Sequence, residues 1–303
     1  MRPFRFGAVL REAESGKAWA DKARRLEDSG FGLLLVPDHL TGDRLAPIPA
    51  LTAAACATER LRVGTLVLAN DFRHPAVLAK EAATLDLLSG GRLEVGLGTG
   101  WMAADYAGAG LPLDPPGVRV ERLAEAIAVL KGLWADGPCH FTGRHYRIDG
   151  LDQRPRPVQR PHPPLLVGGG GPRVLRLAAE QADHVNLTMR VRPDGTGPDT
   201  GDGGVEAFLA RLRRVRAAAG DRYDRLELGT SVMQVGESKA DEPWSAARSA
   251  ALDGTPQVLL GTRHDIADTL RHWRDEHDVS CFVLHHERDL PAFTPVAEEL
   301  AGR

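Results

Sequence analysis

Short apolar segments alternate with helix-like segments along the whole chain, and this alternation limits the possible fold more than any other feature. An apolar run such as FGLLLVPDH at 31–39 is typical of a strand buried on both faces of a parallel sheet. The helical stretches between such strands are the crossovers that cover a parallel sheet from outside. We predict strands over 4–10, 31–39, 61–68, 92–98, 164–171, 183–188, 226–236 and 280–286, and helices over 17–30, 47–59, 75–91, 117–135, 172–182, 205–219, 243–254, 264–276 and 291–301.

About eight strand–helix units predict an α/β fold, a (β/α)8 TIM barrel that takes up residues 1–303 as one domain. The alternation is interrupted after the fourth strand, where 140–151 is typical of a surface hairpin and 153–164 of an extended proline-rich segment. A second insertion follows the sixth strand, where the polar, glycine-rich stretch 192–204 predicts a mobile loop. The alternative is a doubly wound sheet with a second domain, for which only 137–164 offers a change in composition.

Composition and charge exclude several classes of function. The 303 residues are 43% hydrophobic and 26% charged, and the net charge is −3, which argues against nucleic acid or an anionic membrane as a partner. Cys56, Cys139 and Cys281 lie far apart and form no CxxC motif, so we expect neither a disulfide framework nor a bound metal. No stretch approaches about 20 apolar residues. We therefore expect a cytoplasmic protein that acts on a small molecule.

Two predicted strand ends carry glycine clusters, GLGTGW at 96–101 and GGGGPR at 168–173. Trp101 and Arg173 stand where the G-x-G-x-x-G dinucleotide fingerprint requires its third glycine, so neither cluster fits that motif. For either cluster alone, glycines that merely end a strand are an equally good interpretation. In a barrel, however, both clusters lie at one mouth, and bare N–H groups before a helix bind anions. Together they predict a phosphorylated cofactor, and a bulky residue at Gly170 is expected to weaken its binding with little effect on the fold.

Histidines and an aspartate follow two other predicted strands. VPDHL places Asp38 and His39 at the same mouth, and histidine exchanges protons near neutral pH, although such a pair is also common in surface loops. We interpret His39 as a candidate catalytic acid or base. His285 and His286 follow the last predicted strand without a convincing metal-ligand spacing, so we expect them to shape a substrate pocket.

A linked set of segments resembles the bacterial luciferase-like family, and most closely its coenzyme F420-dependent oxidoreductases. The resemblance extends over nearly the whole chain and implies a TIM barrel with a long insertion, a deazaflavin or flavin in the mouth, and a homodimer. The segments are VPDH (36–39), GTLVLANDFRHPAVLAKEAATLDLLSGGRLEVGLGTGW (64–101), DY (105–106), RVERLAEAIAVLKGLW (119–134), PLLVGGGGPRVLRLAAEQAD (164–183) and LLGTRHDIADTL (259–270).

The resemblance also implies roles for individual residues. His39 matches the family's active-site histidine, and Asp38 matches the acid beside the ring system. A backbone distortion at Leu66–Val67–Leu68, often a non-prolyl cis peptide in this family, would press the strand against the ring. The implied cofactor contacts are Asp38, Val67, Ala69, Thr99, Gly100 and Trp101 around the ring, and Gly170, Gly171, Arg173 and Val174 at the phosphate.

The implied activity is hydride transfer between coenzyme F420 and a small organic substrate. The family's sugar-phosphate dehydrogenases carry Glu where this chain has Trp101 and Asn where it has Ala104. The missing carboxylate favours a more apolar substrate. The alternatives are an FMN-dependent monooxygenase on the same barrel and a non-catalytic flavin-binding protein.

Overall fold

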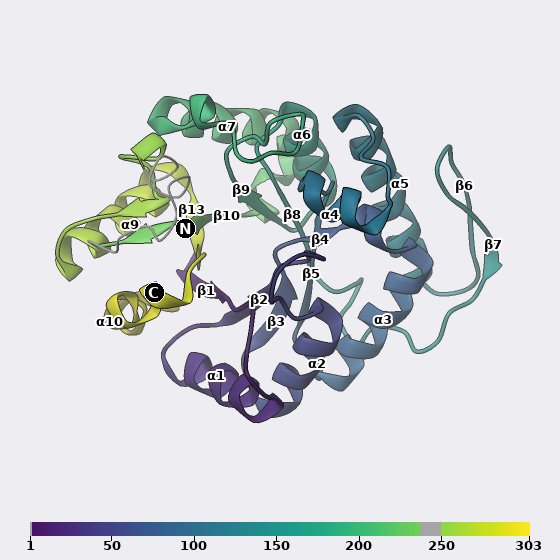
Figure 1. Cartoon of the computed structure of the whole chain (residues 1–303), viewed down its shortest axis with the longest axis horizontal. Coiled ribbons are helices and arrows are strands. Elements are labelled where there is room, and N and C mark those ends of the chain that lie inside the picture. Colours follow the sequence, from purple (N-terminus) through teal and green to yellow (C-terminus); the bar gives the residue numbers. More distant parts are fainter. Residues whose placement is uncertain (1, 237–249) are drawn as a thin grey trace.

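A closed parallel barrel with helices outside it forms the centre of the molecule (Figure 1). The computed structural model describes residues 2–236 and 250–303, so most of the helix predicted over 243–254 lies outside the described residues. The strands of the barrel are β1 (Arg5–Val9), β2 (Leu33–Val36), β3 (Arg62–Thr65), β4 (Leu68–Ala69), β5 (Leu93–Gly98), β8 (Leu165–Gly169), β9 (His184–Leu187), β10 (Glu227–Val232) and β13 (Val279–Leu284).

The sheet closes into a barrel because β3, at one end of the strand order, also pairs with β5 near the other end. The order is β3-β2-β1-β13-β10-β9-β8-β5-β4, and β3 also pairs with β5. Every one of these pairs is parallel. With β3 and β4 counted as one position, the barrel has eight, which confirms the predicted (β/α)8 fold.

The predicted third strand, 61–68, is interrupted in its middle. The peptide bond Leu66–Val67 is cis, and the ladder with β5 resumes at Leu68. This confirms the distortion that the family resemblance implied. The predicted strand 226–236 is also divided, because β10 ends at Val232 and β11 (Gln234–Val235) pairs outside the barrel with β12 (Val258–Leu259).

Helices surround the barrel, and local sequence explains several of their ends. Ser15 accepts a hydrogen bond from the N–H of Ala18 at the start of α1 (Gly16–Asp28), and Thr262 and Asp265 form a capping box at the start of α9 (Arg263–His277). No helix in the described part of the chain is both long and apolar enough to cross a membrane. The described helices are α1 (Gly16–Asp28), α2 (Pro47–Ala57), α3 (Pro75–Leu88), α4 (Ala103–Ala109), α5 (Pro116–Trp134), α6 (Pro172–Gln181), α7 (Gly204–Ala219), α9 (Arg263–His277) and α10 (Leu290–Leu300).

Both predicted insertions are present. Between β5 and β8 the chain forms α4, α5 and the antiparallel hairpin of β6 (Cys139–Thr142) and β7 (Arg147–Leu151), which projects at the edge of the molecule (Figure 1). Residues 188–203, which we call the strap, follow β9. The strap contains the predicted loop, and its backbone closes a bridge between Val191 and Pro198 before the short helix Thr200–Asp202.

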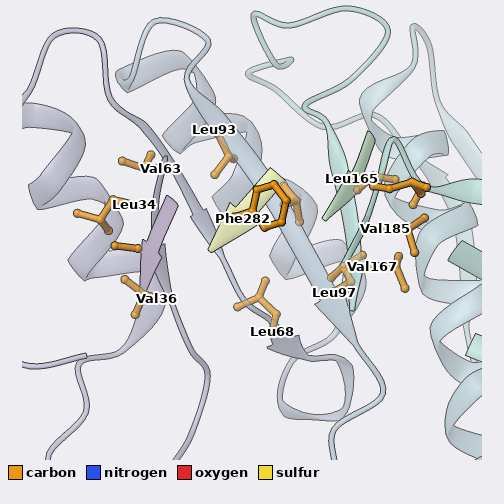
Figure 2. Packing of buried hydrophobic residues seen from close by; sticks show 14 of the residues in the cluster. Leu34, Val36, Val63, Leu68, Leu93, Leu97, Leu165, Val167, Val185 and Phe282 are labelled. Carbon is orange, nitrogen blue, oxygen red and sulfur yellow. The ribbon is translucent and has the colours of Figure 1, made fainter. Parts of the chain in front are cut away.

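Apolar side chains are divided between the two faces of the barrel strands. Alternate residues of a strand point to opposite sides, so Leu34 and Val36 of β2 join the large cluster that the strands share with the helices (Figure 2). Leu33 and Leu35 instead join a small separate cluster with residues of β1 and β13. The chain thus has an outer core under the helices and a small inner core.

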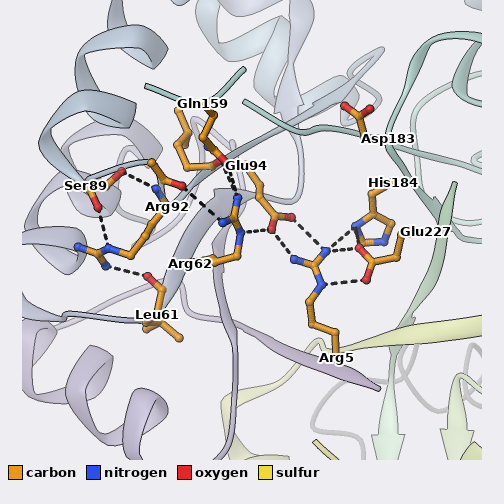
Figure 3. A network of polar contacts seen from close by, with 12 residues as sticks. Arg5, Leu61, Arg62, Ser89, Arg92, Glu94, Gln159, Asp183, His184 and Glu227 are labelled. Carbon is orange, nitrogen blue, oxygen red and sulfur yellow. Dashed lines mark hydrogen bonds and ion pairs between the residues drawn. The ribbon is translucent and has the colours of Figure 1, made fainter. Parts of the chain in front are cut away.

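Charged side chains occupy the barrel interior at the end where the strands begin (Figure 3). Arg5 lies between two carboxylates: its Nη2 is 3.1 Å from Glu94 Oε2, and its Nε is 2.9 Å from Glu227 Oε1. Arg62 Nε donates to the same Glu94 at 2.5 Å. Burial alone would raise the pKa of Glu94, but Arg5 and Arg62 outweigh it and lower that pKa to about 2.

Glu94→Gln should lower the free energy of unfolding by about 3 kcal/mol at neutral pH, because it leaves buried positive charge uncompensated. The pKa of Glu94 rises from about 2 in the folded state to about 4.5 when unfolded, so its contribution is complete above pH 4.5 and is lost as the pH falls toward 2. Denaturant unfolding at several pH values should therefore show wild type and variant converging in acid. Asp28→Asn is the control, since Asp28 and Arg60 form an exposed pair 4.0 Å apart. Equal effects of the two substitutions would contradict this account.

Candidate active site

The carboxyl ends of the barrel strands form a mouth, and the break between β3 and β4 shapes its wall. A Cβ on Gly98 would lie 2.5 Å from Val67 Cγ2, and one on Gly168 would lie 3.2 Å from Val67 Cγ1. The glycines at the ends of β5 and β8 therefore make room for the Val67 side chain. The predicted cofactor contacts Val67 and Ala69 lie at this wall, and their role remains a prediction.

His39, just after β2, forms a hydrogen-bonded pair with an aspartate that the sequence analysis did not select. His39 Nδ1 is 2.7 Å from Asp105 Oδ2. The other oxygen of Asp105 accepts from the N–H of Leu40 at 3.1 Å and from the N–H and hydroxyl of Thr41 at 3.0 and 2.8 Å. Asp105 belongs to the first turn of α4. Its carboxylate thus joins this helix to the loop that carries His39.

The electrostatics of this pair favour a neutral imidazole. Burial lowers the pKa of His39 and Arg44 acts in the same direction, while Asp105 and Asp38 only partly oppose them. Burial would raise the pKa of Asp105, but hydrogen bonds from His39 and Thr41 outweigh it and lower that pKa. A carboxylate can only accept, so His39 Nδ1 carries the proton and Nε2 keeps a lone pair. His39 is therefore arranged as a base at neutral pH.

Asp38 has a different set of partners from its neighbour. Its side chain is buried, and it accepts from the N–H of Ala69 at 3.0 Å and from both Nη atoms of Arg73 at 2.6 and 3.2 Å. Both carboxylate oxygens are thereby engaged, and the end of β2 is tied to β4. The contact of Asp38 with a cofactor ring edge remains a prediction.

A cavity of about 300 Å³ lies beside Arg73. It is bounded by the residues that follow β4, by α5 and by the hairpin.

An aromatic side chain stands beside the imidazole. The rings of His39 and Trp101 lie 5.8 Å apart at an angle of 86°, and Met102 Sδ is 3.7 Å from the Thr41 hydroxyl. Trp101 therefore presents an aromatic surface next to the candidate base. Thr99 and Gly100 precede it, and a Cβ on Gly100 would lie 1.9 Å from Tyr106 Oη.

The predicted phosphate end lies where β8 leads into α6. Gly171 is the residue before the first turn of α6, and no side chain caps that end. The N–H groups of Arg173 and Val174 lie in the uncapped first turn, as an anion site requires. A Cβ on Gly171 would meet nothing closer than 3.9 Å, so this face of the turn is open.

Gly170 has a structural role that the sequence analysis did not anticipate. A Cβ there would lie 2.2 Å from the carbonyl oxygen of Thr188 and 2.6–2.7 Å from backbone atoms of Met189 and Arg190. The expectation that a bulky residue at Gly170 leaves the fold intact is therefore wrong, because the backbone of the strap occupies the space. Of the two glycines, only Gly171 has room for a side chain, and the binding of a phosphate at the N–H groups of Gly170 and Gly171 remains a prediction.

His285 and His286 lie at the far side of the mouth from the glycine turns. They follow β13, which pairs with β1 and β10, and their rings are 5.0 Å apart. The carbonyl oxygen of His285 accepts from Arg11 Nη1 at 2.5 Å. Their predicted place in a substrate pocket remains a prediction.

A cluster of possible metal ligands among the described residues lies at the opposite end of the barrel. His184, Glu227 and Cys281 bring their ligand atoms within 4.8 Å of one another. The Arg5 guanidinium lies 3.4 Å from His184 Nδ1 and also pairs with Glu227, so an arginine supplies positive charge there. This group lies apart from the mouth and from His39.

A family model described as luciferase-like monooxygenase matches residues 1–300. Among curated proteins, the chain is 27% identical over 265 residues to an FMNH(2)-dependent dimethylsulfone monooxygenase of Pseudomonas putida, which covers 84% of this chain and 69% of that protein. It is 32% identical over 233 residues to an F420-dependent glucose-6-phosphate dehydrogenase of Nakamurella multipartita, covering 74% of this chain and 66% of the relative. The chain thus spans about two thirds of the length of these relatives.

Solved structures share the fold at low sequence identity. The coenzyme F420-dependent tetrahydromethanopterin reductase of Methanopyrus kandleri superposes with a TM-score of 0.77 at 18% identity, over 99% of this chain and 98% of that one. A long-chain alkane monooxygenase superposes with a TM-score of 0.78 at 15% identity, over 99% and 91%. These similarities support the barrel and leave the reaction to other evidence.

Gly170→Ala should lower the thermal unfolding midpoint by several degrees, because its Cβ would overlap the strap backbone. Gly171→Ala should leave the midpoint nearly unchanged, since its site is open and its φ of −75° suits alanine. Differential scanning calorimetry of the two variants beside wild type provides the measurement. Similar midpoints for both variants would show that the steric argument fails.

Proposed function

The chain belongs to the luciferase-like monooxygenase family, and on this basis we propose that it is a coenzyme F420-dependent oxidoreductase that transfers a hydride between the deazaflavin and a small organic substrate. The observation that carries the proposal is the neutral His39, held by Asp105 at the mouth with its Nε2 lone pair available. A hydride moves together with a proton when an alcohol becomes a carbonyl compound, and such a histidine can exchange that proton.

The residues at the mouth fit a planar cofactor that ends in a phosphate. The open turn at Gly171, with the N–H groups that begin α6, would hold the phosphate. The backbone around Val67 and Ala69 would lie against the ring, as would Thr99 and Gly100. When bound, the deazaflavin would supply or accept the hydride at a single carbon.

The protein's own contribution to the reaction is proton exchange and positioning. During oxidation, His39 Nε2 would take the proton of a substrate hydroxyl group, and during reduction the imidazolium would return it to a carbonyl oxygen. Asp105 keeps the ring in the tautomer with Nδ1–H and stabilises the imidazolium when it forms. Trp101 would cover the substrate from one side and favour apolar groups over a phosphorylated sugar.

A second candidate is an FMN-dependent monooxygenase, favoured by the match of 84% of the chain to the dimethylsulfone monooxygenase. Anaerobic titration with F420 and with FMN, followed by an assay for oxygen-dependent product, separates the two. We expect F420 to bind and FMN to bind weakly. Tight FMN binding with oxygen consumption and no affinity for F420 would overturn the proposal.

Gly171→Asp should weaken F420 binding at least tenfold in the same titration. An aspartate before the first turn caps a helix well, so α6 should be as stable as in wild type or more stable. The new carboxylate would nevertheless occupy the N–H groups and repel a phosphate. Gly171→Ser, which caps the helix without charge, should retain more affinity. Unchanged affinity in the aspartate variant would place the phosphate elsewhere.

His39→Ala should reduce turnover by about 10²–10⁴-fold with cofactor affinity retained, as expected for loss of a general acid–base. His140, on the exposed hairpin, provides the control, and His140→Ala should turn over normally. Because the pKa of His39 is lowered from 6.5, the base form predominates at neutral pH. In the oxidation direction, kcat/KM should therefore decline in acid with a midpoint below pH 6.5. A midpoint above pH 6.5 would contradict the role of His39 as this base.

A further inference from the structure

The strap links two segments at the mouth, the one that follows β9 and the one that follows β5. It starts after β9, and the neighbouring position in the sheet is β8, followed by β5. Its buried tip, Gly195, accepts a hydrogen bond at 3.1 Å from the N–H of Ala103, the first residue of α4. The strap therefore passes the end of β8 and rests on the segment that follows β5.

Glycine is the residue type that suits this contact at position 195. The φ of Gly195 is +71°, a conformation that glycine adopts without strain. A Cβ there would lie 2.3 Å from the carbonyl oxygen of Trp101 and 2.9 Å from the nitrogen of Ala103. The tip thus presses directly on the backbone between the two groups that flank His39, the Trp101 ring and the Asp105 carboxylate.

This contact supplies a hydrogen-bond partner to the first turn of helix α4. The helix has seven residues, and Met102, which precedes it, provides no side-chain cap. Short helices are marginal on their own, and their first N–H groups need partners. The Gly195 carbonyl supplies one at Ala103, two residues before Asp105.

The strap itself is held from its other end. Asp202 accepts from the N–H of Arg190 at 2.9 Å and from Arg211 Nη1 of α7 at 2.7 Å. The N–H of Asp199 donates to the carbonyl of Arg190 at 2.8 Å. These bonds fix the base of the strap independently of α4, so the strap can position the helix.

We propose that Gly195 is a positioning residue: by docking the strap on Trp101 and Ala103, it keeps Asp105 and Trp101 in place around His39. The inference rests on the proposed function, since it assigns a task in the same site. Misplacement of a catalytic group by about 1 Å can cost on the order of 10²-fold in rate. The strap would then control catalysis through backbone contact, without itself touching the substrate.

A double-mutant cycle tests the coupling without cofactor. The His39 ring is titrated by NMR in the full chain for wild type, Asp105→Asn, Gly195→Ala and the double variant. The charged groups that face His39 are Asp105, Arg44 and Asp38. Because Asp105 raises the pKa of His39, Asp105→Asn should lower it in wild type, and the lowering should be at most half as large when Gly195→Ala is present. Gly197→Ala is the matched control, since it also has positive φ on the strap but nothing within 4 Å of a Cβ.

Turnover gives the second readout: Gly195→Ala should reduce kcat by about 10–100-fold, and Gly197→Ala by much less. Equal effects of Asp105→Asn on the His39 pKa with and without Gly195→Ala would overturn the positioning role. A different result would separate the two proposals. If Gly195→Ala weakens the effect of Asp105→Asn on the His39 pKa, but His39→Ala turns over normally, the proposed function is overturned and the positioning role is kept. If Gly195→Ala does not fold, Asp202→Ala loosens the base of the strap, and the same reduction in coupling is expected.

Discussion

Closure of the parallel sheet between β3 and β5 is the constraint on which the active-site end depends. A closed barrel has no free edge, so each strand must find two neighbours. β3 pairs with β5 through Val63 and Gly64, and after a break at Leu66–Val67 the ladder resumes in β4. The break turns the Val67 side chain onto glycines of β5 and β8, and it brings the Ala69 N–H to Asp38. The wall of the mouth is thus a consequence of how the sheet closes.

The adjacent residues Asp38 and His39 show how one short turn serves two purposes. Asp38 is bound in a bidentate ion pair with Arg73 and ties two strands together. His39 points to a separate carboxylate that belongs to an inserted helix. The contact of Asp38 lies within the barrel, whereas the contact of His39 joins the barrel to the insertion. The chemistry of the site is therefore assembled where the barrel and its insertion meet.

Periodic features of the chain could be predicted from the sequence, and particular side-chain partners could not. Strand and helix periods gave the barrel, and linked motifs led to His39 and to the break at Leu66–Val67. Asp105 lies 66 residues from His39, and only the DY motif hinted at it, because pairing across loops depends on the folded path of the chain. The steric role of Gly170 was hidden for the same reason: its partner, the backbone at Thr188, carries no sequence signal.

The charged end of the barrel also bears on the order in which ligands could bind and leave. Arg5, Glu94 and Glu227 occupy the interior where the strands begin, so a ligand bound at the carboxyl ends of the described strands would approach from the mouth. Two ligands that both enter through the mouth would have to bind one after the other. A ring lying deep against the strand ends would have to enter before the substrate that covers it and could depart only afterwards. Under the proposed function this favours a compulsory order of binding and release, in which product inhibition would be competitive only between the two forms of the cofactor and noncompetitive in the other combinations.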